Sequence, residues 1–494
     1  MTEQFIENIR NVLATRADGR GIEYRGIWSS WGEVGAFGDK IEAALEAAGA
    51  SRKGRIAFII HNRAAHAAAL TGLLAHRRAA SFIYPIAAPV QMAETLRDLR
   101  PVAIIADVDD WAKVSDVAAE IGAAGIILDG IDKAPRLEGK SDVPADILDA
   151  ALSFEDAAVE VLSSGTTGAP KRIPMPARIL DRAALSAPGA ETEGEQPVQI
   201  SVWPLSGVGG LCLFAGSAAT GTPLVLLDRF SVPEFVDAVK RHQPPSLGLS
   251  PTAVTMLLNG EFDPKDLSSV KGIFGGSAHL DPDIQDQFEA KFGIPIYWAM
   301  GATEFCGTII RWTPAMRAEV GNSKRGSIGT AMPGIELRVA DVDTGAILPT
   351  GETGVMEVFC PQIRPDWVRT TDLVAIDPDG YVFHKGRSDG AITRGGFKIL
   401  PEKIIEVLRS HPAIADASVV GLPDARLGAV PVAAVELKNG QTTTPAELSD
   451  YVRNALAPTY VPTQIRIVDA LPRTPSLKPS LRDVRALFED AAAA

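Results

Sequence analysis

The chain has 494 residues, which is long for a single domain and predicts two or more. A formal net charge of −13 argues against a general nucleic-acid binder, and 46% hydrophobic with 22% charged residues is ordinary for a soluble globular protein. Three widely spaced cysteines, Cys212, Cys306 and Cys360, predict neither a zinc site nor a disulfide framework. The first residues do not form a secretory signal, so we expect a cytoplasmic protein.

Helices and strands alternate along the first part of the chain. In order, we expect a helix over Trp31–Ala48 opened by Ser29 and Ser30, a strand over Arg55–Ile60, a helix over Ala64–His76, a strand over Ser81–Tyr84, a helix over Met92–Leu99, and strands over Val102–Ala106 and Gly125–Leu128. Such alternation predicts parallel sheets with helices on both faces.

One uncharged segment, Val198–Leu227, invites comparison with a membrane span. It holds Pro204, Pro223 and many small residues, which are typical of packed globular structure. We therefore expect a buried helix over Val208–Ala219 and a buried strand over Leu224–Leu227, and no integral membrane segment.

The pattern changes after Gly326, where short strands are separated by turn residues. The expected elements are strands over Glu336–Ala340, Gly354–Phe359 and Tyr381–His384, then a helix over Lys403–Ser410 and strands over Ala415–Val420 and Ala429–Leu437. The first three strands predict an antiparallel, barrel-like subdomain, and the later elements predict a small α/β unit.

A glycine- and hydroxyl-rich loop follows the apolar lead at Val161–Leu162. Glycine lets backbone N–H groups approach a ligand closely, and such groups with hydroxyls and a lysine can cradle phosphate oxygens. The spacing is not that of a Walker loop, and Pro170 makes a flexible linker the weaker interpretation. The candidate phosphate-binding residues are Ser164, Gly165, Thr166, Thr167, Gly168 and Lys171.

This loop resembles the phosphate loop of the adenylate-forming superfamily, which includes acyl-CoA synthetases, peptide-synthetase adenylation domains and firefly-type luciferases. Four further segments resemble the family's remaining motifs in the right order: Met300–Glu304, Trp367–Asp372, Gly386–Asp389 and Pro472–Lys478. Each segment alone would be read as a helix cap, a turn or a surface charge. As an ordered set over essentially the whole chain, they identify it as a member of the acyl-CoA synthetase type.

The resemblance implies roles for the charged and hydroxyl residues of these motifs. It implies that Thr303 meets phosphate and that Glu304 holds Mg²⁺, a cation that prefers few carboxylates alongside phosphate and water oxygens. Asp372 is implied to accept hydrogen bonds from both ribose hydroxyls of ATP, which a carboxylate can do. Arg387 is implied to reach the ribose as well, and Lys478 to be the catalytic lysine.

Several positions depart from the family pattern. Met300 stands where an aromatic residue usually stacks on adenine, although methionine can also cover a purine face. Leu477 and Thr371 each replace a glycine, Gly390 replaces an acidic residue, and Gly207 replaces a histidine. None of these changes removes a group that must carry charge in the reaction, so we expect an active enzyme.

The implied fold is α/β. A large N-terminal domain, residues 1–388, would hold two doubly wound parallel sheets and a small β-barrel subdomain. A small mobile C-terminal α/β domain, residues 389–494, would carry Lys478 and rotate about a hinge at Asp389. The rotation would bring in a second face, Gly395, Gly396 and Phe397, which would line the CoA channel.

The predicted function is that of an ATP-dependent acyl-CoA synthetase, with ATP, Mg²⁺ and CoA as its partners. Its other substrate would be a hydrophobic carboxylic acid, whether fatty, alicyclic or aromatic, activated as an acyl-adenylate. The chain is expected to be a monomer or a homodimer. The expected acyl pocket contains Trp203, Gly207, Gly248, Gly275, Gly276, Trp298 and Gly301.

Other functions remain as alternatives. A stand-alone adenylation enzyme that loads a carrier protein is the main one, and the ability of free CoA to accept the acyl group would distinguish it. An amino-acid adenylation domain is disfavoured because Leu205–Val208 has no carboxylate. A luciferase-type oxygenase is disfavoured because Thr393 stands where that group has a lysine. The retained Glu304, Asp372 and Lys478 argue against a non-enzymatic binding module.

Overall fold

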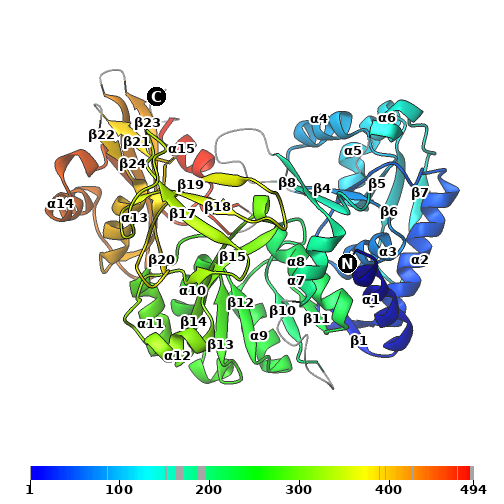
Figure 1. Ribbon diagram of the computed structural model, residues 1–494, viewed down its shortest axis with the longest axis horizontal. Helices are drawn as coiled ribbons and strands as arrows, with labels where there is room; N and C mark the ends of the chain where they lie inside the picture. The colour runs from blue at the N-terminus through cyan, green and yellow to red at the C-terminus, as the bar shows by residue number, and fades with distance from the viewer. Residues whose placement is uncertain are drawn as a thin grey trace. The chain divides into compact units, whose positions relative to one another are not determined.

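A computed structural model describes the chain apart from residues 1, 86, 151–152, 163–170, 186–195, 389, 395–396, 425–426, 475–476 and 490–494. The chain divides into two compact units (Figure 1). The first comprises residues 1–248, 262–272 and 302–307, and the second comprises residues 249–261, 273–301 and 308–494. Across the described residues, no helix combines the length and the apolar character needed to cross a bilayer.

The first unit is built of short helices and strands in alternation. Its helices are α1 Thr2–Thr15, α2 Trp31–Ala47, α3 Ala64–Ala75, α4 Pro89–Leu99, α5 Val108–Ile121, α6 Ala145–Ala150, α7 Ala177–Leu185, α8 Val208–Thr220, α9 Val232–His242, η1 Pro264–Leu267 and η2 Thr303–Phe305. Its strands are β1 Arg20–Tyr24, β2 Ile27–Ser30, β3 Ile56–Ile59, β4 Ala80–Ile83, β5 Ala103–Asp107, β6 Ala124–Leu128, β7 Arg136–Glu138, β8 Val159–Leu162, β9 Arg172–Met175, β10 Gln199–Ser201 and β11 Leu224–Leu226.

A seven-stranded sheet in the order β7-β6-β5-β3-β4-β8-β9 forms the centre of this unit. Its five inner strands are parallel and its two edge strands antiparallel. The strands β3 and β5 are neighbours, yet β3 leads through α3 to β4 and β5 leads through α5 to β6, on opposite sides. Such a point, where the strand order diverges, opens a crevice at the carboxyl ends of the strands.

The second sheet of this unit has the order β10-β11-β1-β2, with β10, β11 and β1 parallel and β2 antiparallel. Of its strands only β11 was expected from the sequence, because the strands are only three to five residues long and come from segments about 200 residues apart. Strand β11 of this sheet and the helix α8 that precedes it agree closely with the elements expected in the uncharged segment.

The second unit carries the remaining elements. Its helices are α10 Pro251–Leu258, α11 Pro282–Phe292, α12 Pro314–Val320, α13 Pro401–Ser410, α14 Pro445–Ala455, α15 Leu481–Glu489 and η3 Pro458–Tyr460. Its strands are β12 Ser246–Leu249, β13 Gly272–Gly275, β14 Ile296–Ala302, β15 Gly307–Arg311, β16 Thr330–Ala331, β17 Glu336–Ala340, β18 Gly354–Phe359, β19 Trp367–Ile376, β20 Val382–Arg387, β21 Ile392–Arg394, β22 Phe397–Ile399, β23 Ile414–Asp424, β24 Gly428–Leu437 and β25 Gln464–Val468. The boundary between the two units runs through β12, β13, β14 and β15.

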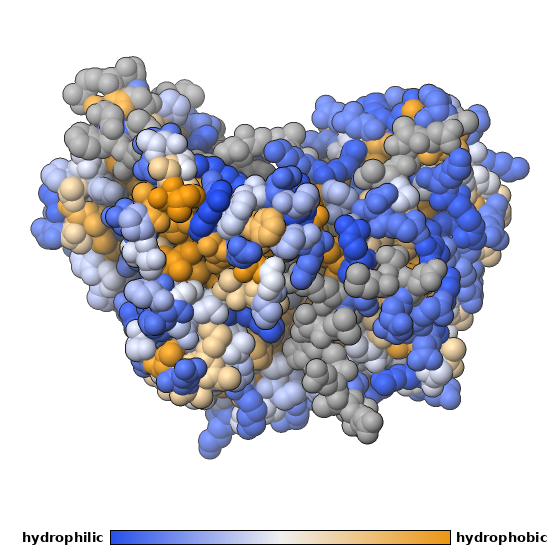
Figure 2. Space-filling view, in the orientation of Figure 1, coloured by the Kyte–Doolittle hydropathy of each residue, from blue (hydrophilic) through white to orange (hydrophobic). Residues whose placement is uncertain are grey.

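These strands form three sheets. In the first sheet, of order β12-β13-β14-β15-β16, strands β13 and β14 pair in parallel. In the second sheet, of order β17-β18-β19-β20, every pair of neighbouring strands is antiparallel. The antiparallel character expected after Gly326 is therefore confirmed. Figure 2 shows apolar side chains chiefly around β17 and β19, where several side chains are only half-buried. The last sheet, β22-β21-β24-β23 with β25, packs α13 and α14 against a core that includes Ile404 and Leu448.

Local sequence explains where the helices begin. The Ser30 hydroxyl caps α2 by accepting from the Glu33 N–H, and the Glu33 carboxylate accepts in turn from the Ser30 N–H. Helices α2 and α3 then pack with two glycines face to face (Figure 1). A Cβ atom at Gly38 would lie 2.7 Å from the Gly72 Cα, closer than real contacts allow.

The contact between α2 and α3 can be tested by adding one methyl group. Gly38→Ala should lower the free energy of unfolding by about 1–3 kcal/mol, as overpacking of a core does. Gly35→Ala on the same helix is the matched control, because its Cβ would lie 3.5 Å from the Leu13 side chain in ordinary contact. Urea denaturation of both variants measures the difference, and equal stabilities would refute this account of the helix pair.

Candidate active site

The predicted site residues are distributed over both units. In the first unit lie Lys171, Trp203, Gly207, Gly248, Thr303 and Glu304. In the second lie Gly275, Gly276, Trp298, Met300, Gly301, Asp372, Arg387, Phe397 and Lys478. Outside the described residues lie Ser164, Gly165, Thr166, Thr167, Gly168, Asp389, Gly395 and Gly396.

Two antiparallel strands bring Asp372 and Arg387 together. Asp372 on β19 is the register partner of Arg387 on β20, and the Arg387 NH1 lies 3.7 Å from the Asp372 Oδ1. The register shifts between Leu373 and Val374, an irregularity of the kind that re-aims side chains beside active sites. The Asp372 side chain is 14% exposed, and among the described residues its Oδ2 has no hydrogen bond or ion pair.

Lys478, from the far end of the chain, belongs to the same cluster. Loss of contact with water, together with the positive charge of Arg387, lowers the pKa of Lys478 below its ordinary value. The carboxylate of Asp372 acts in the opposite direction and favours the ammonium form. Asp372 and Arg387 thus lie near enough to influence the charge of Lys478, although more than 100 residues separate Asp372 from Lys478.

Two histidines adjoin this cluster, and the motifs did not predict His384 as part of it. The His384 Nε2 lies 3.2 Å from the Asp372 Oδ1, and its ring stacks on that of His279 with centroids 5.9 Å apart. His384 comes three residues before Arg387 on β20. Only the register of the two strands reveals its position, so the sequence alone offered no signal for it.

A buried carboxylate explains one glycine of the motif. Gly386 has φ +118°, and a Cβ atom there would lie 2.8 Å from the Glu402 Oε2. Burial raises the pKa of Glu402, and this oxygen has no hydrogen-bond partner among the described residues. A side chain at position 386 would therefore both strain the backbone and displace Glu402 from beside Arg387.

In the first unit, Thr303 and Glu304 form the short helix η2, which ends at Cys306 with φ +54°. The Glu304 side chain is exposed, and among the described residues it makes no hydrogen bond or ion pair. Lys171 directly precedes β9 and is exposed as well. Glu304 is thus an open position, suited to a ligand that supplies its own oxygen atoms.

The small residues of the expected acyl pocket serve partly in packing. A Cβ at Gly275 would lie 2.2 Å from the Trp298 ring, and one at Gly276 would lie 2.7 Å from the Ala299 carbonyl oxygen. The Trp298 ring is buried, and its Nε1–H donates to the Ala278 carbonyl at 3.0 Å. Gly275 therefore makes room for an aromatic side chain of the protein itself.

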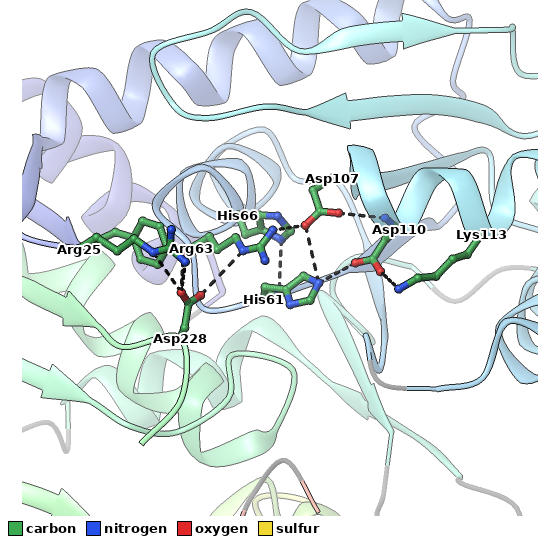
Figure 3. A network of polar contacts seen from close by, with 9 residues as sticks. Arg25, His61, Arg63, His66, Asp107, Asp110, Lys113 and Asp228 are labelled. Carbon is green, nitrogen blue, oxygen red and sulfur yellow. Dashed lines mark hydrogen bonds and ion pairs between the residues drawn. The ribbon is translucent and has the colours of Figure 1, made fainter. Parts of the chain in front are cut away.

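A second polar cluster, also absent from the sequence analysis, lies at the carboxyl ends of β3 and β5 in the first unit (Figure 3). The His61 Nε2 lies 2.6 Å from the Asp110 Oδ2 and 3.8 Å from the Asp107 Oδ2. Burial opposes ionisation of Asp110, but hydrogen bonds with His61 and Lys113 outweigh it and lower its pKa. Arg63 pairs with Asp107 and Lys113 pairs with Asp110, so each carboxylate already has a cationic partner. The cluster of His61, Asp107 and Asp110 links the ends of β3 and β5, and we call it the brace.

Comparison with known proteins extends these observations. A profile described as AMP-binding enzyme matches residues 10–363, and one described as AMP-binding enzyme C-terminal domain matches residues 403–478. The protein "4-coumarate--CoA ligase-like 9" of Oryza sativa subsp. japonica is 29% identical over 496 residues, covering 93% of this chain and 87% of that protein.

Two solved structures share the fold. The anthranilate CoA ligase AuaEII in complex with anthranoyl-AMP aligns with a TM-score of 0.82 at 22% identity, covering 99% of this chain and 98% of that chain. The amide bond synthetase McbA from Marinactinospora thermotolerans aligns with a TM-score of 0.78 at 25% identity, covering 98% and 100%. The predicted fold class, a large and a small α/β part with several sheets, is confirmed.

The charges around Lys478 predict how its titration responds to mutation. Arg387→Gln should raise the pKa of Lys478, because a like charge is removed, and Asp372→Asn should lower it further. Asp366→Asn, which removes an exposed carboxylate from the same strand region, is the control and should leave it unchanged. NMR titration of ¹³C-methylated lysines measures each value, and shifts of the opposite sign would contradict the described geometry.

Proposed function

The chain belongs to the family of AMP-binding enzymes, as its five motifs predicted, and on that premise we propose that it is an acyl-CoA synthetase. In this proposal it activates a hydrophobic carboxylic acid with ATP and then transfers the acyl group to CoA. The observation that carries the proposal is the convergence of Asp372, Arg387 and Lys478 in one charged cluster. The acid–thiol ligase class agrees with the CoA ligases among its relatives.

The chemistry explains why such a cluster is needed. A carboxylate is a poor electrophile, because attack on it would have to expel an oxide. Attack of the carboxylate oxygen on the α-phosphorus of ATP forms a new P–O bond, breaks the bond to pyrophosphate, and leaves an acyl-adenylate. Two anions must meet in this step, so catalysis depends on positioning and on neutralising charge. We assign that neutralisation to the Lys478 ammonium, which would lie between the two.

The nucleotide would be held by groups from several of the motifs. The Asp372 Oδ2, which has no partner among the described residues, would accept from a ribose hydroxyl. Arg387 would approach the ribose from β20, and Met300 would cover the adenine. Thr303 would meet the α-phosphate, and the loop from Ser164 to Lys171 would hold the leaving pyrophosphate.

The chain also offers a position for Mg²⁺. Glu304 presents an exposed carboxylate without a protein partner among the described residues, and Mg²⁺ usually takes one or two carboxylates with phosphate and water oxygens. The residues present therefore fit this ion, with Glu304 as its protein ligand. When bound, Mg²⁺ would reduce the negative charge of the phosphates that Thr303 and Lys171 face.

The acid is proposed to be hydrophobic, and within that class we favour an aromatic one. The expected pocket residues are apolar or small, and the relatives' names include 4-coumarate and anthranilate. Trp203, which is only half-buried, would supply aromatic surface for such a ring. No lysine or arginine was expected among these pocket residues, which disfavours an acid with a second carboxylate.

The transfer step requires CoA to reach the acyl carbonyl. We propose that residues 389–494 rotate about Asp389, that Lys478 withdraws, and that Gly395, Gly396 and Phe397 line the channel for the thiol. The CoA sulfur would then attack the acyl carbon, forming the thioester and releasing AMP. ATP and CoA as partners make the cytoplasm the proposed compartment, with the enzyme acting as a monomer or homodimer.

The direct test is acid-dependent formation of AMP from ATP and Mg²⁺ across aliphatic, alicyclic and aromatic acids, with products identified by mass spectrometry. Each acid is supplied with CoA, with an amine, or with neither. AMP together with an acyl-CoA is the expected result. An acyl-adenylate that CoA does not discharge would contradict the CoA proposal and favour a carrier protein, or an amine of the kind suggested by McbA. No adenylate from any acid would overturn the proposal.

Asp372 provides a sharper prediction within the first step. Asp372→Asn should raise the KM for ATP by at least about tenfold, because hydrogen bonds to a charged group contribute roughly 1.5–3 kcal/mol. Asp366→Asn removes an equal charge at an exposed position and serves as the control. Steady-state kinetics at saturating acid measure both variants. An unchanged KM for ATP in Asp372→Asn would refute the ribose assignment.

A further inference from the structure

The backbone immediately before Lys478 adopts an unusual conformation. Leu477 has φ +63°, in the left-handed region that a residue with a side chain seldom adopts. The family motif that Pro472–Lys478 resembles has glycine at this position. A leucine there is held against its own preference, so its neighbours must fix the backbone.

Two side chains fix the Leu477 carbonyl, in an arrangement that we call the carbonyl clamp. The Thr252 Oγ1–H donates to this carbonyl oxygen at 2.9 Å, and the Arg473 NH1 donates to it at 3.3 Å. The same Arg473 nitrogen lies 3.3 Å from the Thr252 Oγ1. The clamp therefore consists of Thr252 from the first turn of α10, Arg473, and the carbonyl between them.

Arg473 is itself held rigidly. Its NH2 donates to the Asp416 Oδ2 at 2.6 Å, and Arg409 donates to the other oxygen of that carboxylate at 2.6 Å and 2.9 Å. Burial works to raise the pKa of Asp416, but the two guanidinium groups outweigh it and keep the pKa below its ordinary value. Asp416 is thus an ionised anchor, and Arg473 remains in place as long as this pair survives.

The clamp acts one peptide away from the catalytic lysine. The Thr474 N–H donates to the Lys478 carbonyl at 2.7 Å, the Leu477 N–H donates to the Thr474 carbonyl at 2.9 Å, and Arg473 bridges to Pro479. Because these bonds tie the Lys478 backbone to the clamp, the position of the Leu477 carbonyl determines where the lysine side chain starts. The charges of Arg387 and Asp372 act on the ammonium group of that side chain.

The clamp and the ion pairs that hold Arg473 come from two parts of the chain. Arg409, Asp416 and Arg473 all lie within residues 403–478, which match the C-terminal domain profile, whereas Thr252 lies outside them. If the C-terminal residues turn about Asp389, the ion pairs among them would move as one body. The hydrogen bond from Thr252 is the part that would have to break.

We propose that Thr252 and Arg473 are positioning residues that hold Lys478 in place for adenylation, and that the Thr252 hydroxyl is released for thioester formation. The proposal rests on the proposed synthetase function and its hinge. It predicts that the two half-reactions respond differently to loss of the hydroxyl. Adenylation needs the bond, whereas thioester formation occurs after the bond has broken.

The half-reactions test this asymmetry. Thr252→Val removes the hydroxyl at nearly constant volume, and should slow acid-dependent pyrophosphate release by about fivefold, the effect of one ordinary hydrogen bond. CoA-dependent discharge of supplied acyl-adenylate should be unchanged or faster. Thr252→Ser should restore adenylation. Thr255→Val is the matched control, because within the described part of the chain that hydroxyl donates only to the Pro251 carbonyl of its own helix, at 3.1 Å.

Equal loss of both half-reactions in Thr252→Val, or a rate equal to that of Thr255→Val, would overturn the clamp. If the unmodified chain forms no adenylate, the proposed function is wrong. A second measurement then tests whether the clamp exists. Hydrogen–deuterium exchange of the Leu477 and Ser480 amides should be faster in Thr252→Val than in Thr255→Val. Identical exchange in the two variants would overturn the clamp independently of activity.

Discussion

The structure depends most on the position of the Lys478 ammonium group, which is half-buried and lies within the influence of the positive charge of Arg387. Lys478 is disfavoured as a charge both by desolvation and by Arg387, and only Asp372 offsets them. An arrangement of this kind persists only where the backbone is firmly held. The antiparallel register of β19 and β20 holds the two partners, and the hydrogen bonds around Leu477 hold the lysine. A cation kept ready in this way suits a reaction that brings two anions together.

Close packing of backbone is a second recurring feature. Gly38 and Gly72 let α2 and α3 touch, Gly210 lies against the Pro204 carbonyl, and Gly275 admits the Trp298 ring. Two glycines of the expected acyl pocket, Gly275 and Gly276, therefore lie against other groups of the protein itself. The size of the acyl pocket cannot be inferred from small residues alone, because each vacancy must be weighed against the side chain that occupies it.

Much of the fold and the family could be predicted from the sequence. The helix at α2, the strands β17 and β18, and the helix and strand around α8 and β11 agree with the expected bounds within a residue or two, because local periodicity and caps determine them. The adenylate-forming resemblance and the α/β class are confirmed by the family profiles and the solved structures. The division at Asp389 and the individual residue roles stay predictions, since no observation tests them.

What the sequence did not predict comes from contacts between distant segments. His384 reaches Asp372 only through strand register, and Thr252 meets Leu477 across 225 residues. The brace of His61, Asp107 and Asp110 joins residues of two neighbouring strands and the helix that follows one of them. No periodicity encodes such pairs. Leu477 is the exception, because its departure from a glycine motif already indicated a loop built differently from that of its relatives.

The central claim is that Asp372, Arg387 and Lys478 together form the nucleotide and acyl-transfer centre. A crystal structure with a non-hydrolysable acyl-adenylate analogue tests it most directly. The account predicts ribose hydroxyls on the Asp372 carboxylate, with the Lys478 Nζ within hydrogen-bonding distance of the oxygens around the α-phosphorus. A ribose bound away from Asp372, or a Lys478 side chain pointing away from the phosphate, would contradict it.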